Sequence, residues 1–358
     1  MPKPSYAVLL VAYGAPDSLD DVEPYLLDVR GGRPTPATLV EELRNRYAAI
    51  GGRSPLLPRS QAQAEALRAE RENARYLPGL QLAPAIEVKT VPEIEFAGVD
   101  LVVLAVPCAS LPAAVGEIGA RMGDRSAVLV TSKGLVPPLG TTPAAFVSER
   151  VRARAVATLA GPAHAREAIE LGASVVLASR DANLRRQLHD MLEAGGLTVE
   201  ATDDVTGTEF AACAKNAAAL GSAAAAPRGA NLAGAAAGHI FSEIHELALA
   251  SGGRSETFAG LAGAGDLVAT AIAEGSRNRR AGEMVGAGVP AGQVEASMDQ
   301  TAESLATVPL LGLAFERQGI DAPVTTGLLR VLHGESSPEQ WLESVRSARQ
   351  PRRRTHAA

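Results

Sequence analysis

The 358-residue sequence has only two cysteines, Cys108 and Cys213, and no long uninterrupted apolar run. Two cysteines cannot form a disulfide framework, and we expect them in a reducing cytoplasm. The apolar run at residues 7–12 is short and leads into a turn, so it predicts no secretory signal. The alanine-rich stretch 217–240 is interrupted by proline and polar residues and is too polar to cross a bilayer. We therefore expect a cytoplasmic protein without a membrane span.

Neither sign of charge is in large excess, with 34 Lys and Arg against 40 Asp and Glu and a net charge of -6. This balance predicts no nucleic-acid partner. Only residues 341–358 form a basic tail, which the pattern predicts to be a solvated end. The histidines lack the spacing of metal ligands, so no metal site is predicted.

A dinucleotide-binding fingerprint is also missing near the start of the chain. The stretch "YAVLLVAYGAPDS", residues 6–18, predicts a buried strand that ends in a glycine turn. Its turn contains only Gly14, whereas a dinucleotide site needs the spacing G-x-G-x-x-G. Helical patterns follow this strand, first after Ser18 and again within residues 35–52.

Four later apolar runs predict buried strands, within residues 99–107, 126–134, 155–165 and 172–179. They alternate with helical segments, which indicates a largely parallel sheet with helices on both faces. From Gly207 to about Gly334 strand patterns nearly vanish, and Ala, Leu and Glu recur at helical spacing. The sequence therefore predicts an α/β domain followed by an all-helical domain.

Polar residues at the strand ends and in the helical half are candidates for chemistry. Lys133 ends a strand, where it is either a solvent-exposed lysine or a cation that binds a phosphate or an alkoxide. Lys215, among small apolar residues, is either a surface lysine or a desolvated amine with a lowered pKa. Arg277 offers a planar fork for a phosphate, and Asp266 could hold Lys215 or a substrate hydroxyl. The simpler alternative is a helix-packing region followed by a capping serine.

Taken together in order and spacing, several stretches between about residues 68 and 335 resemble bacterial NAD(P)-dependent glycerol-3-phosphate dehydrogenase. This resemblance implies the reversible reduction of dihydroxyacetone phosphate to sn-glycerol 3-phosphate, with NAD or NADP as cofactor. The cofactor carries the hydride, while the protein places the substrate and moves its proton. The matching stretches are "RENARYLPGLQL", "DLVVLAVP", "SKGL", "LAGPAHARE", "DDVTGTEFAACAKNAAAL", "GLAGAGDLVAT" and "GSRNRRAGEMVGAG".

Site residues carried over from this resemblance are expectations. Lys215 matches the proton donor and acceptor, and Gly161 matches a substrate site on the backbone. Lys133 matches a contact to substrate and cofactor, whereas Ala163 replaces a hydroxyl residue that the family often has. The remaining expected contacts are Asp266, Ser276, Arg277 and Asn278 for substrate and phosphate, with Arg277, Ala165 and Glu295 also for the cofactor.

The first nucleotide-binding unit of that family has no counterpart here. Instead, residues 6–67 resemble the amino-terminal segment of ferrochelatases, including "LLVAYGAPDSLDDVEPYLLDVRGGRP" and "LRNRYAAIGGRSPLL". The histidine and glutamate that perform the metal chemistry of that family have no matching motif in this chain. Ferrochelatase activity is therefore the least favoured reading.

The sequence thus predicts an incomplete or hybrid Rossmann-like α/β domain followed by an all-α domain. The expected divisions are a ferrochelatase-like segment at 1–67, the rest of the Rossmann-like domain at 68–201, a helical substrate domain at 202–340 and the basic tail at 341–358. The favoured function is that of an NAD(P)-dependent glycerol-3-phosphate dehydrogenase, which acts on a small-molecule substrate. A homodimer is one possible assembly. The alternative is a catalytically inactive hybrid protein.

Overall fold

The computed structural model describes residues 37, 41, 64–74, 77–273, 275–298 and 302–349. The expected strand at residues 7–12 lies outside the described residues, as does nearly all of the helical pattern within 35–52. Residues 64–70 are helical, in agreement with the helix-favouring composition of that stretch.

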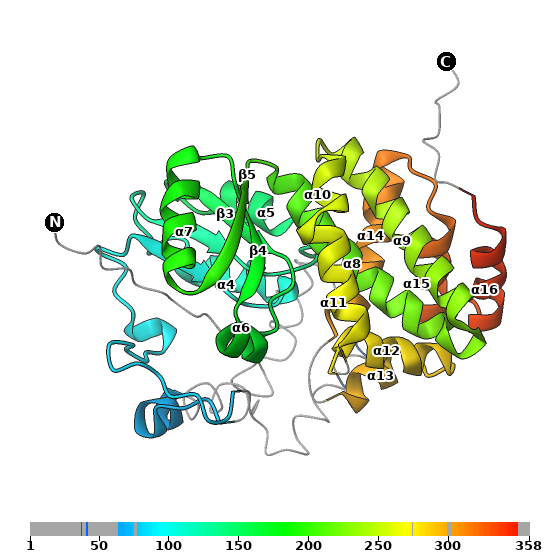
Figure 1. The fold of residues 1–358 in the computed structure, drawn as a ribbon, viewed down its shortest axis with the longest axis horizontal. Coiled ribbons are helices and arrows are strands. Elements are labelled where there is room, and N and C mark those ends of the chain that lie inside the picture. The colour runs from blue at the N-terminus through cyan, green and yellow to red at the C-terminus, as the bar shows by residue number, and fades with distance from the viewer. Residues whose placement is uncertain are drawn as a thin grey trace.

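The α/β domain is built on a five-stranded sheet with the order β1-β2-β3-β4-β5 (Figure 1). The first four strands fall within the four predicted runs. The sequence did not single out the last one. The bounds are β1 Leu101–Leu104, β2 Ala127–Val130, β3 Val156–Ala160, β4 Ala173–Ser179 and β5 Leu197–Thr202.

Three of the four strand pairs are parallel, but β3 and β4 are antiparallel. The sheet is therefore largely parallel, as predicted, with one antiparallel strand pair. The chain between these two strands contains only the short helix α6 (Ala165–Leu171), which has no buried residue. α6 is thus not a crossover helix packed on a face of the sheet. The chain turns back at the end of β3 and runs in the opposite direction along β4.

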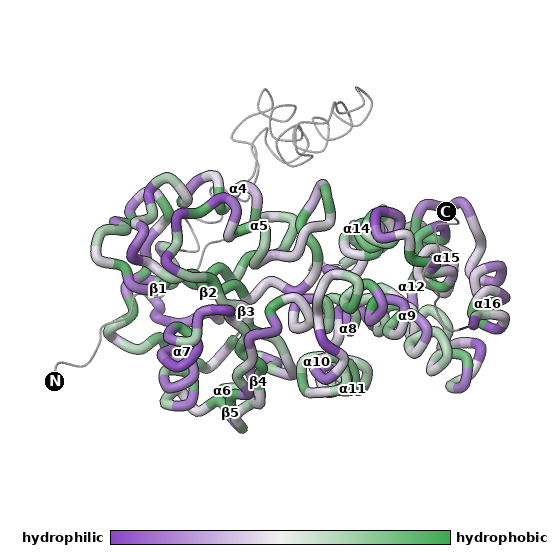
Figure 2. The backbone as a smooth tube through the Cα atoms, turned by 90° about the horizontal axis from the view of Figure 1, so that it is seen from above, coloured by the Kyte–Doolittle hydropathy of each residue, from purple (hydrophilic) through white to green (hydrophobic). Residues whose placement is uncertain are grey.

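Alternation along the strands supplies a core to each face of the sheet. Val102 and Leu104 of β1 face the helices α4 (Leu111–Ile118) and α5 (Pro143–Arg150). Leu101 of the same strand faces α7 (Ala182–Ala194) on the other side. Figure 2 shows α4 and α5 on one side of the strands and α7 on the other, so helices cover both faces of the sheet, as the alternation of strands and helices predicted.

The helical domain is assembled around α8 (Val205–Ala225), where every residue from Gly207 to Gly221 is buried. Its many alanines leave room for neighbouring backbones, so helices surround it on several sides. Figure 2 shows α8 near the junction of the sheet and the helical domain. The other α-helices described in this domain are α9 Ala230–Ala250, α10 Ser255–Ala259, α11 Asp266–Ile272, α12 Arg277–Gly286, α13 Ala291–Ser297, α14 Glu303–Gln318, α15 Pro323–Leu332 and α16 Pro338–Ser347.

The last helix corrects the predicted start of the basic tail at residue 341. α16 extends to Ser347 and buries Trp341, Leu342 and Val345 in the core of the helical domain. The Trp341 indole N–H donates a hydrogen bond of 3.0 Å to the carbonyl of Val324. The apolar positions of this segment outweigh its basic residues, so the first part of the expected tail belongs to the helical core.

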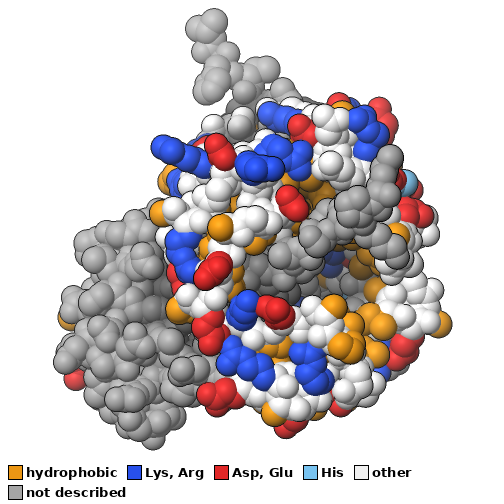
Figure 3. Space-filling view, turned by 90° about the vertical axis from the view of Figure 1, so that its left-hand side faces the viewer, with side chains coloured by type: hydrophobic (Ala, Val, Ile, Leu, Met, Phe, Trp, Pro, Cys, Tyr) orange, Lys and Arg blue, Asp and Glu red, His pale blue; other side chains and the backbone are white. Residues whose placement is uncertain are grey.

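Charges of both signs are mixed on the described part of the face shown in Figure 3. Both cysteine thiols are free and buried. None of the described helices combines the length and the apolar character that crossing a membrane requires.

Candidate active site

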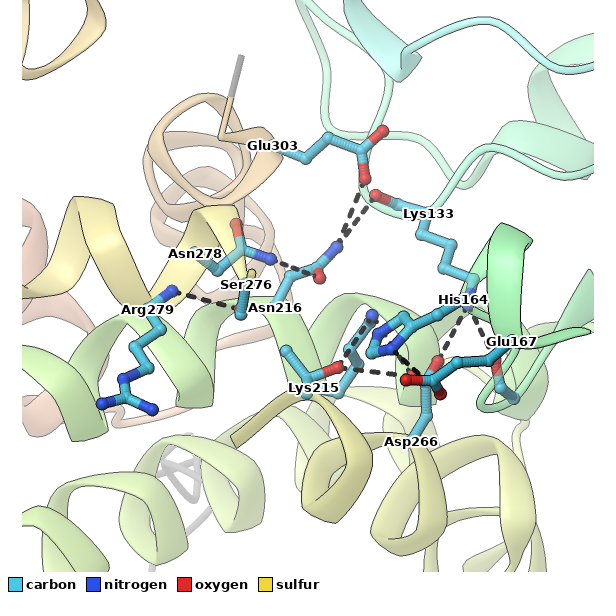
Figure 4. A network of polar contacts seen from close by, with 12 residues as sticks. Lys133, His164, Glu167, Lys215, Asn216, Asp266, Ser276, Asn278, Arg279 and Glu303 are labelled. Atoms are coloured by element: carbon cyan, nitrogen blue, oxygen red, sulfur yellow. Dashed lines mark hydrogen bonds and ion pairs between the residues drawn. The ribbon is translucent and has the colours of Figure 1, made fainter. Parts of the chain in front are cut away.

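The carboxyl ends of β2 and β3 meet α8 and α11 in a network of polar side chains (Figure 4). Lys133 follows β2, and its Nζ donates to the carbonyl of Gly161 after β3, at 2.9 Å. Gly161 has φ +102°, and an added Cβ would lie 3.2 Å from the carbonyl of Ser174. Glycine is therefore the residue suited to this conformation, which presents the carbonyl to Lys133.

Asp266 joins the two candidate lysines. Its Oδ2 accepts from Lys133 Nζ at 2.9 Å, and its Oδ1 lies 3.3 Å from Lys215 Nζ. Asp266 is the first residue of α11, and the residue is only 1% exposed. A π-helical segment, Leu261–Gly265, directly precedes it, an irregularity that often accompanies functional sites. The expected pairing of Asp266 with Lys215 is thus present in the structure.

Lys215 is the desolvated amine that the sequence offered as one of two alternatives. The residue is 8% exposed in the middle of α8, and its Nζ donates to the Thr270 hydroxyl at 3.1 Å. Burial lowers the pKa of Lys215, and repulsion from Lys133 lowers it further, while Asp266 acts in the opposite direction. A lysine of lowered pKa can exchange protons nearer neutral pH than an exposed lysine.

The next three predicted residues lie at the start of α12, where Asn278 joins the network. Ser276 is the N-cap of this helix, and its hydroxyl accepts from the backbone N–H of Arg279 at 3.3 Å. Arg277 is the first helical residue, and Asn278 donates from Nδ2 to Asn216 Oδ1 at 2.7 Å. Ser276 therefore caps α12, as the simpler alternative for this region expected.

Sequence reasoning missed further members of the network, among them Asn216, Thr270 and Glu303. Asn216 directly follows Lys215, and Thr270 is one helical turn after Asp266, so both share a helix with a predicted residue. Burial raises the pKa of the Glu303 carboxyl, whereas Arg277 and both lysines oppose this rise. Glu303 resembles an ordinary acidic residue in the first turn of a helix, and no sequence signal separates it from one.

The two remaining predicted cofactor contacts lie in α6 and α13. Ala165 is the first residue of α6 and is exposed. Glu295 lies in α13, and its side chain falls outside the described residues. In the described part of the chain, no three His, Cys, Asp or Glu side chains form a group that could hold a metal ion.

This geometry joins two lysine amines through one buried carboxylate. Comparison with known proteins agrees with it. A family model for the C-terminus of NAD-dependent glycerol-3-phosphate dehydrogenase matches residues 204–343, and the model for its N-terminus matches residues 48–185. The glycerol-3-phosphate dehydrogenase [NAD(P)+] of Variovorax paradoxus is 34% identical over 81% of this chain and 89% of its own. The chain belongs to the NAD(P)-dependent glycerol-3-phosphate dehydrogenase family.

Other members agree in sequence and in fold. The enzyme of the same name from Methylobacterium radiotolerans is 33% identical over 85% of this chain and 92% of its own. The crystal structure of glycerol-3-phosphate dehydrogenase from Coxiella burnetii matches with a TM-score of 0.74 and 25% identity, over 80% of this chain and 88% of that chain. The family match begins at residue 48, so residues 48–67, which the sequence placed in the N-terminal segment, also match the dehydrogenase.

Proposed function

We propose that the protein interconverts dihydroxyacetone phosphate and sn-glycerol 3-phosphate by NAD(P)-linked hydride transfer. The observation that carries this proposal is the cluster of the buried Lys215 and Asp266 with the half-buried Lys133 at the carboxyl ends of the strands, within a chain of this family. Ligands of open α/β sheets bind at this end of the strands.

Lys215 is the residue that moves the proton in this proposal. Thr270 and Asp266 take two of the hydrogen-bonding directions of its Nζ, which leaves the third for a substrate oxygen. As a neutral amine it accepts the proton of the C2 hydroxyl, and as an ammonium it returns that proton to the carbonyl oxygen. The lowered pKa increases the fraction of neutral amine near neutral pH.

The other cations bind the substrate. Lys133 offers a compact positive charge beside the reacting oxygen, while Arg277 and Asn278 at the start of α12 suit the phosphate. Asp266 holds both lysines, one with each carboxylate oxygen. The substrate is therefore placed between the strand ends and α12, with its C2 oxygen at Lys215.

Lys133, in the loop after β2, and Arg277, at the start of α12, would hold the cofactor, because their positive charges suit its anionic phosphate groups. The bound nicotinamide supplies or accepts the hydride. Ala165 and Glu295 remain proposed contacts to the cofactor. We also propose that a ferrochelatase-like segment replaces the first nucleotide-binding unit, which weakens cofactor binding because the triple-glycine turn is missing. A cytoplasmic location and a homodimer remain predictions.

Oxidation of NADH and NADPH by the full chain, with dihydroxyacetone phosphate as acceptor, tests the function. We expect phosphate-dependent oxidation of at least one cofactor, and none with unphosphorylated dihydroxyacetone. Background rates with both cofactors, together with no heat of cofactor binding in calorimetry, would contradict the proposal and favour the inactive hybrid.

A further inference from the structure

A directional chain of hydrogen bonds connects the start of α14 to the loop after β2. Ser304 donates to Asn278 Oδ1 twice, from its backbone N–H at 3.3 Å and from its hydroxyl at 2.8 Å. Asn278 Nδ2 donates to Asn216 Oδ1 at 2.7 Å, and Asn216 Nδ2 donates to the Lys133 carbonyl at 3.3 Å. The chain joins four segments that are far apart in the sequence.

The two ends of this chain fix the orientation of both amides. A backbone N–H can only donate, so the Asn278 atom that faces Ser304 must be the oxygen. Its NH2 group then faces Asn216, which must answer with its own oxygen. At the other end the Lys133 carbonyl can only accept, so it requires the NH2 group of Asn216. Reversal of either amide would place like groups against each other.

α14 supplies partners to both amides through adjacent residues. Ser304 is fully buried and holds Asn278, while Glu303 Oε2 accepts from Asn216 Nδ2 at 3.4 Å. The N–H groups of a helix's first turn have no acceptor within the helix. Asn278 Oδ1 satisfies the N–H of Ser304, so the same contact caps α14 and orients the amide.

We propose that Ser304 and Glu303 are positioning residues, which orient the amides of Asn278 and Asn216 and through them the backbone at Lys133. This inference rests on the proposed function, in which Asn278 contacts the substrate phosphate and Lys133 contacts the substrate. Neither positioning residue needs to touch the substrate, because each acts through an asparagine. Lys215 takes no part in the chain of bonds, so proton transfer is left in place when the chain is loosened.

Ser304→Ala tests the first half of this inference in the full-length protein. We expect the KM for dihydroxyacetone phosphate to rise about three- to tenfold, the range for one lost hydrogen bond, with kcat and the cofactor KM within about twofold of wild type. Thr208→Val is the matched control, since it removes a buried hydroxyl that donates only to the Asp204 carbonyl of its own helix region. The control should lower thermal stability without changing that KM. An unchanged KM in Ser304→Ala would overturn the role of Ser304.

A double-mutant cycle shows whether Ser304 acts through Asn278. Asn278→Ala should raise the substrate KM by itself, and Ser304→Ala added to it should change the KM no further, since contacting residues are coupled. Additive effects would mean that Ser304 acts by another route and would contradict the inference. Selective ¹⁵N-asparagine labelling adds a readout without turnover: Ser304→Ala should shift the side-chain NH2 signals of Asn278 and Asn216.

Glu303 is tested with a pair of variants that separates hydrogen bonding from charge. Glu303→Gln keeps an oxygen that accepts from Asn216, so we expect a substrate KM within about twofold of wild type. Glu303→Ala removes the acceptor and should raise the KM about threefold or more. Equal effects of the two variants would show that the charge is what matters and would overturn the positioning role.

Calorimetry of the wild-type protein with glycerol 3-phosphate separates this inference from the proposed function. If wild type neither binds this compound nor turns over, the proposed function fails, and the ¹⁵N signals alone decide the amide chain. If wild type binds and turns over while all the α14 variants match it, only the positioning inference fails.

Discussion

Asp266 gives one carboxylate oxygen to each of two lysines, and this sharing sets the protonation of the site. Lys133 and Lys215 repel each other, while Asp266 attracts both amines. Attraction to a carboxylate favours the charged amine, and burial or a neighbouring cation favours the neutral one. Burial and Lys133 therefore lower the pKa of Lys215, whereas Asp266 raises it.

The pH dependence of glycerol 3-phosphate oxidation should follow this balance. The kcat/KM should rise with pH along a limb that reflects Lys215, below the ordinary lysine value of 10.5. Asp266→Asn removes the attraction that raises the pKa, so the limb should move to lower pH. Lys133→Gln removes the repulsion that lowers it, so the limb should move to higher pH. Limbs that coincide in all three proteins would exclude Lys215 as the titrating group.

Individual residues were predictable where the family motif contained them. Lys215, Asp266 and Lys133 were named from the sequence, and the structure brings them together. Asn216 lies in a matching stretch directly after Lys215 but was not named, whereas Glu303 was missed because its role arises from a contact between α8 and the start of α14, 87 residues apart in the chain. No local pattern in a sequence records such a contact.

At the scale of the helix, close packing of α12 on α8 holds the proposed phosphate contacts beside Lys215. A Cβ added at Gly282 would lie 2.3 Å from the carbonyl of Leu220, and one at Gly286 would lie 2.3 Å from that of Ala224. Both glycines face α8, one turn apart, and allow the two backbones to approach. The distance between Asn216 and Asn278 depends on this approach.

Gly282→Ala should therefore push α12 away from α8. We expect a loss of about 1–3 kcal/mol in the free energy of unfolding, typical of overpacking, and a higher substrate KM. Gly238→Ala on α9 is the control, because no described atom outside the adjoining helix backbone lies within 4 Å of its added Cβ. The control should stabilise the helix by about 0.5–1 kcal/mol and leave the KM unchanged. Urea denaturation and initial rates measure both; equal behaviour of the two variants would contradict the packing argument.

Secondary structure was predictable where a pattern was strong. The four strands were found as apolar runs, and the helical domain was found from its composition. The direction of β4 was not, because a short exposed helix and a crossover helix look alike in sequence. β5 was not singled out either, since most of its residues are exposed or only partly buried.

For the whole molecule, a buried carboxylate links the two domains. Glu209 of α8 accepts a hydrogen bond of 2.7 Å from the backbone N–H of Ala144 at the start of α5. Burial raises the pKa of Glu209 from 4.5 to about 7. The folded protein therefore holds this proton more tightly than the unfolded chain does.

The free energy of unfolding should depend on pH because Glu209 is buried. The stabilising contribution of the proton is complete below pH 4.5 and is lost as pH rises to about 7, a change of about 3 kcal/mol. Glu209→Gln cannot ionise, so its melting temperature relative to wild type should increase between pH 5 and pH 8. A difference in melting temperature that stays constant over this range would contradict the assignment.

The most direct test of the central claim compares wild type with Lys215→Ala in the oxidation of NADH or NADPH by dihydroxyacetone phosphate. The site geometry predicts measurable turnover in wild type and a loss of roughly 10²- to 10⁴-fold in kcat for the variant, the usual range for removal of a general acid–base group. Cofactor affinity, followed by fluorescence, should be nearly unchanged. Turnover in Lys215→Ala equal to that of wild type would contradict the claim that this buried amine moves the substrate proton.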